Sequence, residues 1–275
     1  MKQLFILIVL VLGITFITKA QHENSLVNDN DIIEENNQLD WDMSLTMKSQ
    51  NIFRGLLPSE SPAMATQVGV IYKDWVFGMY GGVGLNGVYQ ETDFIIAYRK
   101  PRYNIRLDYY YNFTQGITDI PDPSGIFDFN KQTTRGLLDL MVNIQLDEKG
   151  HWNLKTSTLL FGRDNELEYL QQGNETITRR GAQRYSQYLA LEYNWYWGEN
   201  KIKAHAGGAF SLNDPSGQHF YGKHAGFNDI GIAFTRNIKL NNEVKLPIKV
   251  ATVFNPLAGR SYVNFSIDLI PLCTL

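Results

Sequence analysis

The feature that most constrains the fold is an alternation of apolar and polar residues with a period of two. In the segment 103–113, apolar or aromatic residues occupy every second position, and Asn, Arg or Asp occupy most positions between them. The segment 138–146 repeats the pattern. Successive side chains of a strand point to opposite faces of a sheet, so each segment has one apolar and one mostly polar face. The pattern therefore predicts strands.

About twelve such segments of roughly 9 to 13 residues follow one another, which is the length that a tilted strand needs to cross a membrane. Strands of soluble proteins are usually about five or six residues long. We therefore predict an all-β fold, a transmembrane antiparallel up-and-down β-barrel of about 12 strands. A soluble β-sandwich is the main alternative fold, but it does not explain the strand length. The segments start near Trp41, Ala63, Trp75, Glu91, Tyr103, Thr134, His151, Arg184, Lys201, Ala225, Val244 and Ser261.

The connections alternate between tight turns and longer loops. Tight turns occur at 73–74, 100–102, 147–150, 198–200 and 240–243, whereas the long loops include 114–133, 162–183 and 214–224. Short periplasmic turns and long extracellular loops are typical of outer-membrane barrels. With this orientation every tryptophan falls at the periplasmic rim, where an indole ring favours the headgroup level. The predicted membrane-interface residues are Trp41, Trp75, Trp152, Trp195 and Trp197.

The first segment predicts export. A basic start, an almost entirely apolar run over 4–17 and a small-residue site before residue 21 indicate a signal peptide at residues 1–20. An uncleaved membrane anchor is the alternative. Residues 21–40 are polar and acidic and predict a flexible periplasmic lead-in, and residues 41–275 form the barrel. Cys273 is the only cysteine, so an intrachain disulfide is excluded. We expect the outer membrane of a Gram-negative bacterium as the location.

The first strands contain several short motifs within roughly 45–99. They are Ser49 to Gly55, Pro62-Ala63, Gln67, Val76 to Gly82, Glu91-Thr92-Asp93 and Tyr98. This stretch resembles the TorF-type porin family, whose barrels open with an Arg-Gly loop, a Pro-Ala pair and a Gly-rich strand. The resemblance implies a porin-like channel.

The polar face of the strands is predicted to line the lumen. These charges would be prohibitive in an apolar core, so water or dense ion pairing must accompany them. We predict passive diffusion of small polar solutes; the alternative is a non-conducting structural or adhesive barrel that acts through its long loops. Paired charges and an inward-folded loop would favour that alternative. The predicted pore-lining residues are Lys48, Asp93, Arg99, Arg106, Asp108, Arg135, Asp139, Lys155, Glu192, Lys201, Lys203, His205, Lys245 and Lys249.

No motif predicts an enzyme, a metal or a cofactor. The sequence lacks the GxSxG and HExxH signatures. Asp214, His219 and His224 lie near one another in a long loop, but their spacing matches no known metal site. A net charge of −3 gives no electrostatic case for nucleic acid. Expected partners are outer-membrane lipid and small polar solutes, and the oligomeric state stays open.

Some individual residues either have two interpretations or test the predicted barrel. Lys201, Lys203 and His205 share a strand face and form either a local anion-attracting site or an ordinary wet wall. Arg236 lies on an apolar face, which predicts a place near the periplasmic interface. Pro247 removes a ladder hydrogen bond, so we expect a bulge or kink there. Loop residues that either fold inward or cover the rim are Phe127, Asp128, Phe129 and Tyr169.

Overall fold

The computed structural model describes residues 39–114, 125–172, 175–214, 216–239 and 245–271. The predicted signal peptide, nearly all of the predicted lead-in and the last four residues lie outside this part of the chain. Among the described residues, no helix is long and apolar enough to span a membrane.

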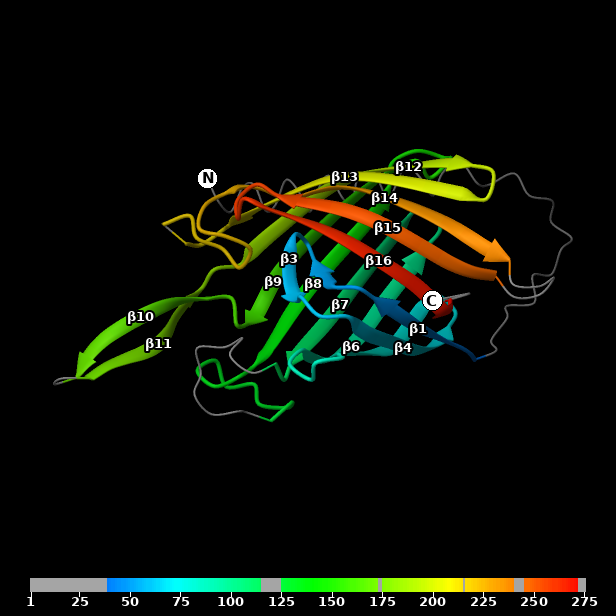
Figure 1. Cartoon of the computed structure of the whole chain (residues 1–275). Helices are drawn as coiled ribbons and strands as arrows, with labels where there is room; N and C mark the ends of the chain where they lie inside the picture. Colours follow the sequence, from blue (N-terminus) through cyan, green and yellow to red (C-terminus); the bar gives the residue numbers. More distant parts are fainter. Residues whose placement is uncertain (1–38, 115–124, 173–174, 215, 240–244, 272–275) are drawn as a thin grey trace, which may run out of the picture. The chain divides into compact units, whose positions relative to one another are not determined.

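Twelve antiparallel strands close into one barrel, which confirms the predicted fold class (Figure 1). Each strand starts within two residues of its predicted position. The first strand pairs with the last over Leu45–Lys48, where Thr46 lies opposite Asp268. This pairing closes the sheet and removes the open edge there. In chain order the barrel strands are β1 (Asp40–Lys48), β4 (Ala63–Tyr72), β5 (Trp75–Gly84), β6 (Gln90–Lys100), β7 (Tyr103–Asn112), β8 (Gly136–Gln145), β9 (Trp152–Gly162), β12 (Ser186–Trp197), β13 (Asn200–Ser211), β14 (Gly226–Lys239), β15 (Lys245–Asn255) and β16 (Arg260–Ile270).

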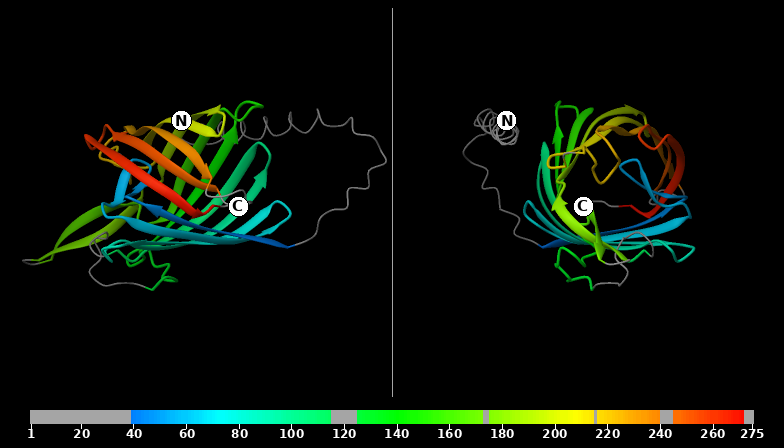
Figure 2. Two further views of the ribbon diagram at one scale, coloured as in Figure 1. Left: turned by 45° about the vertical axis from the view of Figure 1, so that its right-hand side comes forward. Right: turned by 90° about the vertical axis from the view of Figure 1, so that its left-hand side faces the viewer.

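Two further hairpins belong to long connections. β2 (Asn51–Phe53) and β3 (Leu56–Ser59) follow β1, and their hairpin lies inside the ring of strands (Figure 2, right). β10 (Asn165–Gln172) and β11 (Glu175–Gln183) form a second hairpin that projects away from the barrel (Figure 1). The segment 162–183, predicted as a loop, is therefore mostly strand.

The two ends of the barrel differ. One end, called here the short-turn end, carries the connections between β4 and β5, β6 and β7, β8 and β9, and β12 and β13. The opposite, long-loop end carries both extra hairpins. All five tryptophans lie at the short-turn end, and each is at least 43% exposed. Some form aromatic pairs there, such as Trp152 with Tyr193 at 4.7 Å between ring centroids.

The outer face of the barrel is apolar and exposed. Phe77, Ile232 and Val263 are examples, and Val263 is 63% exposed. A contiguous apolar surface of this kind marks a surface that another apolar phase covers. Arg236 interrupts this face where β14 pairs with Asn200, the first residue after the β12–β13 turn, and it thus lies at the short-turn end as expected.

Of the bulge or kink predicted at Pro247, the bulge is absent from the β14–β15 ladder. β14 and β15 keep an unbroken register through the pair Asn237–Pro247. On its other side, the ladder between β15 and β16 begins only at Ile248. Proline therefore lies just outside the β15–β16 ladder, so its missing N–H costs that ladder no hydrogen bond.

Candidate functional site

The β2–β3 hairpin turns tightly at Arg54 and Gly55. Both residues have positive φ, 48° for Arg54 and 75° for Gly55. Two consecutive positive φ angles are the signature of the tight hairpin turn whose twist matches its flanking strands. Glycine adopts such angles readily, whereas arginine does so at a cost in backbone strain. A strained arginine at a turn needs compensating contacts.

Two asparagine side chains hold the backbone of this turn. The amide of Asn228 on β14 donates to the carbonyl of Arg54 at 2.8 Å, and that of Asn255 on β15 donates to the carbonyl of Gly55 at 2.9 Å. A Cβ atom on Gly55 would lie 1.7 Å from the carbonyl oxygen of Asn228. Glycine is thus required both by its φ and by the close approach of β14.

The Arg54 side chain reaches the opposite wall. Its guanidinium donates to Asp139 Oδ2 on β8 at 2.6 Å and to Ser157 Oγ on β9 at 2.6 Å. It also donates to the hydroxyl of Tyr221 in the β13–β14 loop. The Asp139 side chain is completely buried and accepts further hydrogen bonds from Ser157 and Tyr110. We call the contacts of Arg54 with Asp139, Ser157 and Tyr221 the Arg54 latch.

Aromatic rings surround the latch. The guanidinium carbon of Arg54 lies 4.6 Å from the ring centroid of Phe53 and 5.2 Å from that of Tyr188. Such cation–π contacts strengthen when water is excluded. The hairpin thus packs on an apolar cluster inside the barrel, in its long-loop half. Its members are Tyr110, Leu137, Leu159, Tyr188, Ala190, Ala209 and Tyr221, with Phe53, Leu56 and Phe220 against them.

Burial also sets the ionisation of Tyr221. It raises the pKa of this phenol to about 12, against the lowering effect of the Arg54 guanidinium. Tyr221 is therefore a neutral acceptor for Arg54 at physiological pH.

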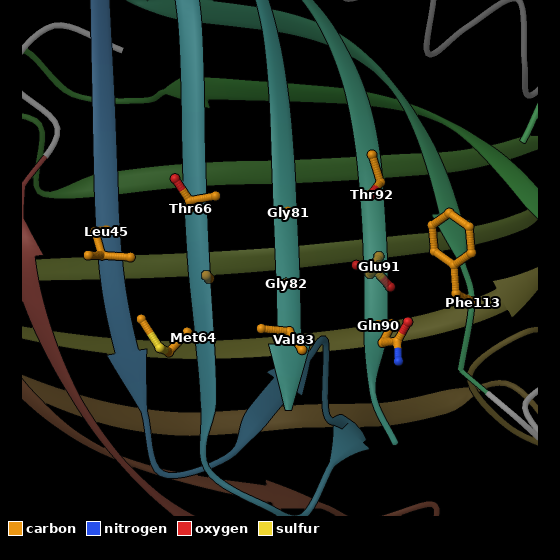
Figure 3. A pocket seen from close by; sticks show the side chains of 11 residues that line it. Leu45, Met64, Thr66, Gly81, Gly82, Val83, Gln90, Glu91, Thr92 and Phe113 are labelled. Atoms are coloured by element: carbon orange, nitrogen blue, oxygen red, sulfur yellow. The ribbon is translucent and has the colours of Figure 1, made fainter. Parts of the chain in front are cut away.

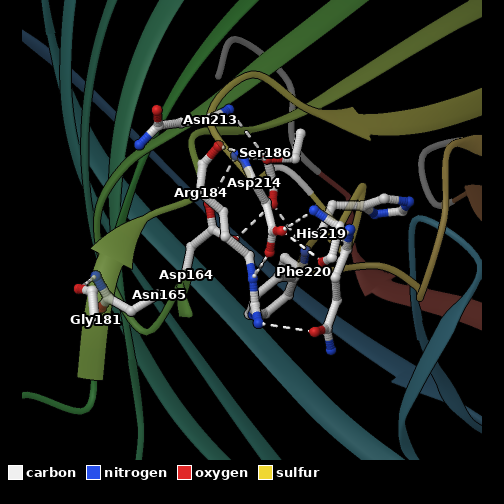
Figure 4. Close-up of polar contacts among 12 residues, drawn as sticks. Asp164, Asn165, Gly181, Arg184, Ser186, Asn213, Asp214, His219 and Phe220 are labelled. Carbon is white, nitrogen blue, oxygen red and sulfur yellow. Dashed lines mark hydrogen bonds and ion pairs between the residues drawn. The ribbon is translucent and has the colours of Figure 1, made fainter. Parts of the chain in front are cut away.

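A polar network positions the loop that carries Tyr221 (Figure 4). The Ser186 hydroxyl donates to Asp164 at 2.6 Å and accepts from the backbone N–H of Phe220 at 2.8 Å. Arg184 forms an ion pair with Asp214 at 2.9 Å. Burial raises the pKa of Asp164 to about 6, although Ser186 donates two hydrogen bonds to it.

The same loop carries the residues considered for a metal. Burial opposes ionisation of Asp214, but hydrogen bonds from Ser216 and Arg184 outweigh it and lower the pKa of that carboxyl. A ring nitrogen of His219 hydrogen-bonds the carbonyl of His224 at 2.8 Å. These side chains are engaged in loop contacts. Within the part of the chain that the structure describes, no group of three His, Cys, Asp or Glu residues is arranged to hold a metal ion.

Most of the predicted lumen residues lie within barrel strands. Two of them do not lie in the interior of a strand. Arg135 precedes β8, and Lys245 is the first residue of β15, at the rim near Glu199. The others lie within barrel strands, as follows: Lys48 on β1, Asp93 and Arg99 on β6, Arg106 and Asp108 on β7, Asp139 on β8, Lys155 on β9, Glu192 on β12, Lys201, Lys203 and His205 on β13, and Lys249 on β15.

Many of these charges form pairs. Arg106 contacts Asp108 at 2.6 Å within β7. Glu192 contacts Lys155 at 2.9 Å and Lys203 at 3.2 Å.

The three residues considered as one anion site separate into different contacts. His205 contacts Asp229 at 2.9 Å, close to the hairpin, and Lys203 contacts Glu192. Lys201 lies over the ring of Tyr196.

The loop aromatics Phe127 and Phe129 pack on the outer face. Phe127 stacks on Phe94, with centroids 6.1 Å apart, and Phe129 lies 5.5 Å from Tyr109. Both loop rings remain more than half exposed. Phe127 and Phe129 therefore cover the rim and do not fold into the lumen. They add an aromatic patch at the long-loop end, opposite the tryptophans.

A hollow of about 490 Å³ is also on the outer face (Figure 3). Small residues on neighbouring strands, Thr66, Gly81 and Thr92, leave it between the larger side chains of Leu45 and Phe113. It faces away from the lumen and is not part of the candidate site.

The sequence interpretation missed the inward hairpin and the apolar cluster beneath it. The available signal for the turn was Arg54-Gly55 between the apolar pairs Ile52-Phe53 and Leu56-Leu57. Leu137 and Leu159 are apolar residues on the otherwise polar parity, and they could have indicated packing inside the barrel.

The sequence matches no protein-family model and none of the curated proteins with which it was compared. The resemblance to the TorF-type family stays a prediction. Among solved structures, a KdgM porin is similar with a TM-score of 0.40 and 9% identity, over 83% of this chain and 96% of that one. A NanC porin is similar with a TM-score of 0.41 and 10% identity, over 82% and 97%.

An outer-membrane channel of Pseudomonas putida F1, described as COG4313, is similar with a TM-score of 0.37 and 9% identity. It covers 85% of this chain and 95% of its own length. Likenesses this distant do not bear on what the present chain does.

Proposed function

We propose that this protein is an outer-membrane channel for passive diffusion of small polar solutes, narrowed in its long-loop half by the β2–β3 hairpin. The barrel strands of 9 to 14 residues suit a bilayer. Their outward face is apolar, and the tryptophans gather at one end, as membrane interfaces favour. The proposal includes export from the cytoplasm of a Gram-negative bacterium by a signal peptide. It also includes membership of the TorF-type family.

One observation carries the channel function. Lysines on the inward face of a closed barrel keep access to solvent: the side chain of Lys155 is 41% exposed and that of Lys203 is 33% exposed. An ammonium group in a dry interior would be prohibitively costly. The exposure of these lysines therefore supports a water-filled passage in the short-turn half of the lumen.

The second candidate function is a non-conducting structural or adhesive barrel. The Arg54 latch favours it, because an inward-folded hairpin with paired charges is what such a barrel requires. The projecting β10–β11 hairpin offers exposed Tyr169, Leu170 and Ile177 as a surface for another molecule. The two candidates differ in whether solute can pass the hairpin.

Single-channel recording on the refolded full-length chain separates them. We expect stepwise conductance in planar bilayers from the unaltered protein, and larger steps from Arg54→Gly, which removes the latch and suits the positive φ. Steps only in Arg54→Gly would indicate a channel closed by its hairpin. Silence in both proteins, with intact folding by circular dichroism, would contradict the channel and favour the structural barrel.

A further inference from the structure

The short-turn half of the lumen contains four neighbouring lysines, Lys155, Lys201, Lys203 and Lys249. Lys249 is within electrostatic range of the other three, although they lie on β9 and β13 and it lies on β15. One carboxylate, Glu192, pairs with Lys155 and Lys203. Among the described residues, Lys201 and Lys249 form no ion pair with a carboxylate. We call these four residues the lysine cluster.

The wall between Lys201 and Lys249 is small and neutral. Thr235 on β14 pairs with Lys201 on one side and with Lys249 on the other. Strands two apart are separated by about 10 Å, so the two lysines flank a gap of that order. The next inward position on β14 is Ala233. No large side chain of β14 fills this gap, and it can admit a small ion between the two ammonium groups.

A second carboxylate lies within electrostatic range of Lys249. It is Asp268 on β16, which also accepts a hydrogen bond from Thr46 on β1 at 2.8 Å. Asp108 pairs with Arg106, Asp139 with Arg54, and Asp229 with His205. The four lysines thus have two carboxylates near them, Glu192 and Asp268, and the cations remain in excess.

We propose that the lysine cluster binds a small multivalent anion, such as phosphate, and makes the lumen selective for anions. Each ammonium group offers three hydrogen-bond donors and no acceptor, which suits an oxyanion. Rings of Lys or Arg are how pores favour anions, and a low-dielectric wall concentrates their field. The inference rests on the proposed channel function and names its substrate class.

Binding of inorganic phosphate to the detergent-solubilised full-length protein, measured by calorimetry, tests the site without requiring conduction. The variant Lys201→Gln/Lys249→Gln removes the two lysines that lack a carboxylate partner. We expect its affinity to fall at least about tenfold, since charge-assisted hydrogen bonds are lost. The matched control is Lys100→Gln/Lys239→Gln, which removes equal charge from lysines paired with Asp74 and Glu199 at the rim. Its affinity should not change.

Absence of phosphate binding by the unaltered protein, or equal losses in the two double variants, would overturn the inference. Reversal potentials in a potassium chloride gradient supply the second readout. An anion preference that the Lys201→Gln/Lys249→Gln variant loses supports both the site and the channel. Conductance without anion preference overturns the selectivity and leaves the channel intact. Phosphate binding without conductance supports the site and contradicts the channel.

Discussion

The Arg54 latch makes a quantitative prediction, because it joins a side chain at a loop tip to a fully buried carboxylate. In Arg54→Gly, Asp139 loses its cation but keeps the hydroxyl donors of Ser157 and Tyr110. Breaking a buried ion pair lowers the free energy of unfolding by about 3–5 kcal/mol. Because Asp139 keeps two hydroxyl donors, we expect a loss of about 3 kcal/mol. Glycine at this position is compatible with the φ of 48°. The decrease in the free energy of unfolding is therefore due to the lost side-chain contacts and not to a distorted turn.

A double-mutant cycle isolates the interaction. Asp139→Asn should cost a similar amount, since it leaves the guanidinium of Arg54 without its counter-charge in a site where only 11% of that side chain is exposed. The double variant Arg54→Gly/Asp139→Asn leaves neither charge unpaired. Its free energy of unfolding should therefore fall by about as much as that of either single variant. We expect a coupling energy of about 2 kcal/mol or more.

The assay is urea titration of folding into lipid vesicles, followed by circular dichroism and gel mobility. A coupling energy below about 0.5 kcal/mol, the scatter expected for independent sites, would refute the latch as a stabilising contact.

Three further outcomes are expected. Gly55→Ala should destabilise the fold more than Gly87→Ala by about 1–3 kcal/mol in the same titration. Both positions have positive φ, but an added Cβ would lie 1.7 Å from the carbonyl oxygen of Asn228 at residue 55 and would meet nothing within 4 Å at residue 87. Equal losses would disprove the close approach. The folded protein binds a proton at Asp164 more tightly than the unfolded chain does, since the pKa rises from 3.8 to about 6. Stability should thus increase by up to about 3 kcal/mol as pH falls from above 6 to near 4, relative to Asp164→Asn, and parallel pH profiles would argue against this. Finally, the intrinsic fluorescence should be quenched more by lipids brominated near the headgroup than by lipids brominated near the chain end, because every tryptophan lies at one rim; the reverse order would exclude the rim from the interface.

Local pattern was enough for most of the barrel. A period of two assigns each side chain to one of two faces, so the apolar face and the strand starts follow from neighbouring residues alone. Glycines and short polar turns mark where strands end. Strand length then distinguishes a membrane barrel from a sandwich. The position of Arg236 follows in the same way, because its place late in β14 determines its depth.

The candidate site depended on distances that no local pattern contains. Arg54 meets Asp139, Ser157 and Tyr221 across sequence separations of 85, 103 and 167 residues. The sequence identified charges for the lumen, but it could not indicate which of them pair or that a hairpin enters. Pro247 shows the same limit, since its tolerance depends on where the ladder with β16 begins.

The sequence by itself determined the class of fold, because closing a sheet of about twelve amphipathic strands is the one way to satisfy every backbone group in lipid. Only the tertiary structure decided what occupies the enclosed space. Loop direction, ion pairing and the solvent access of the lysine cluster arise when strands far apart in the chain face each other across the lumen.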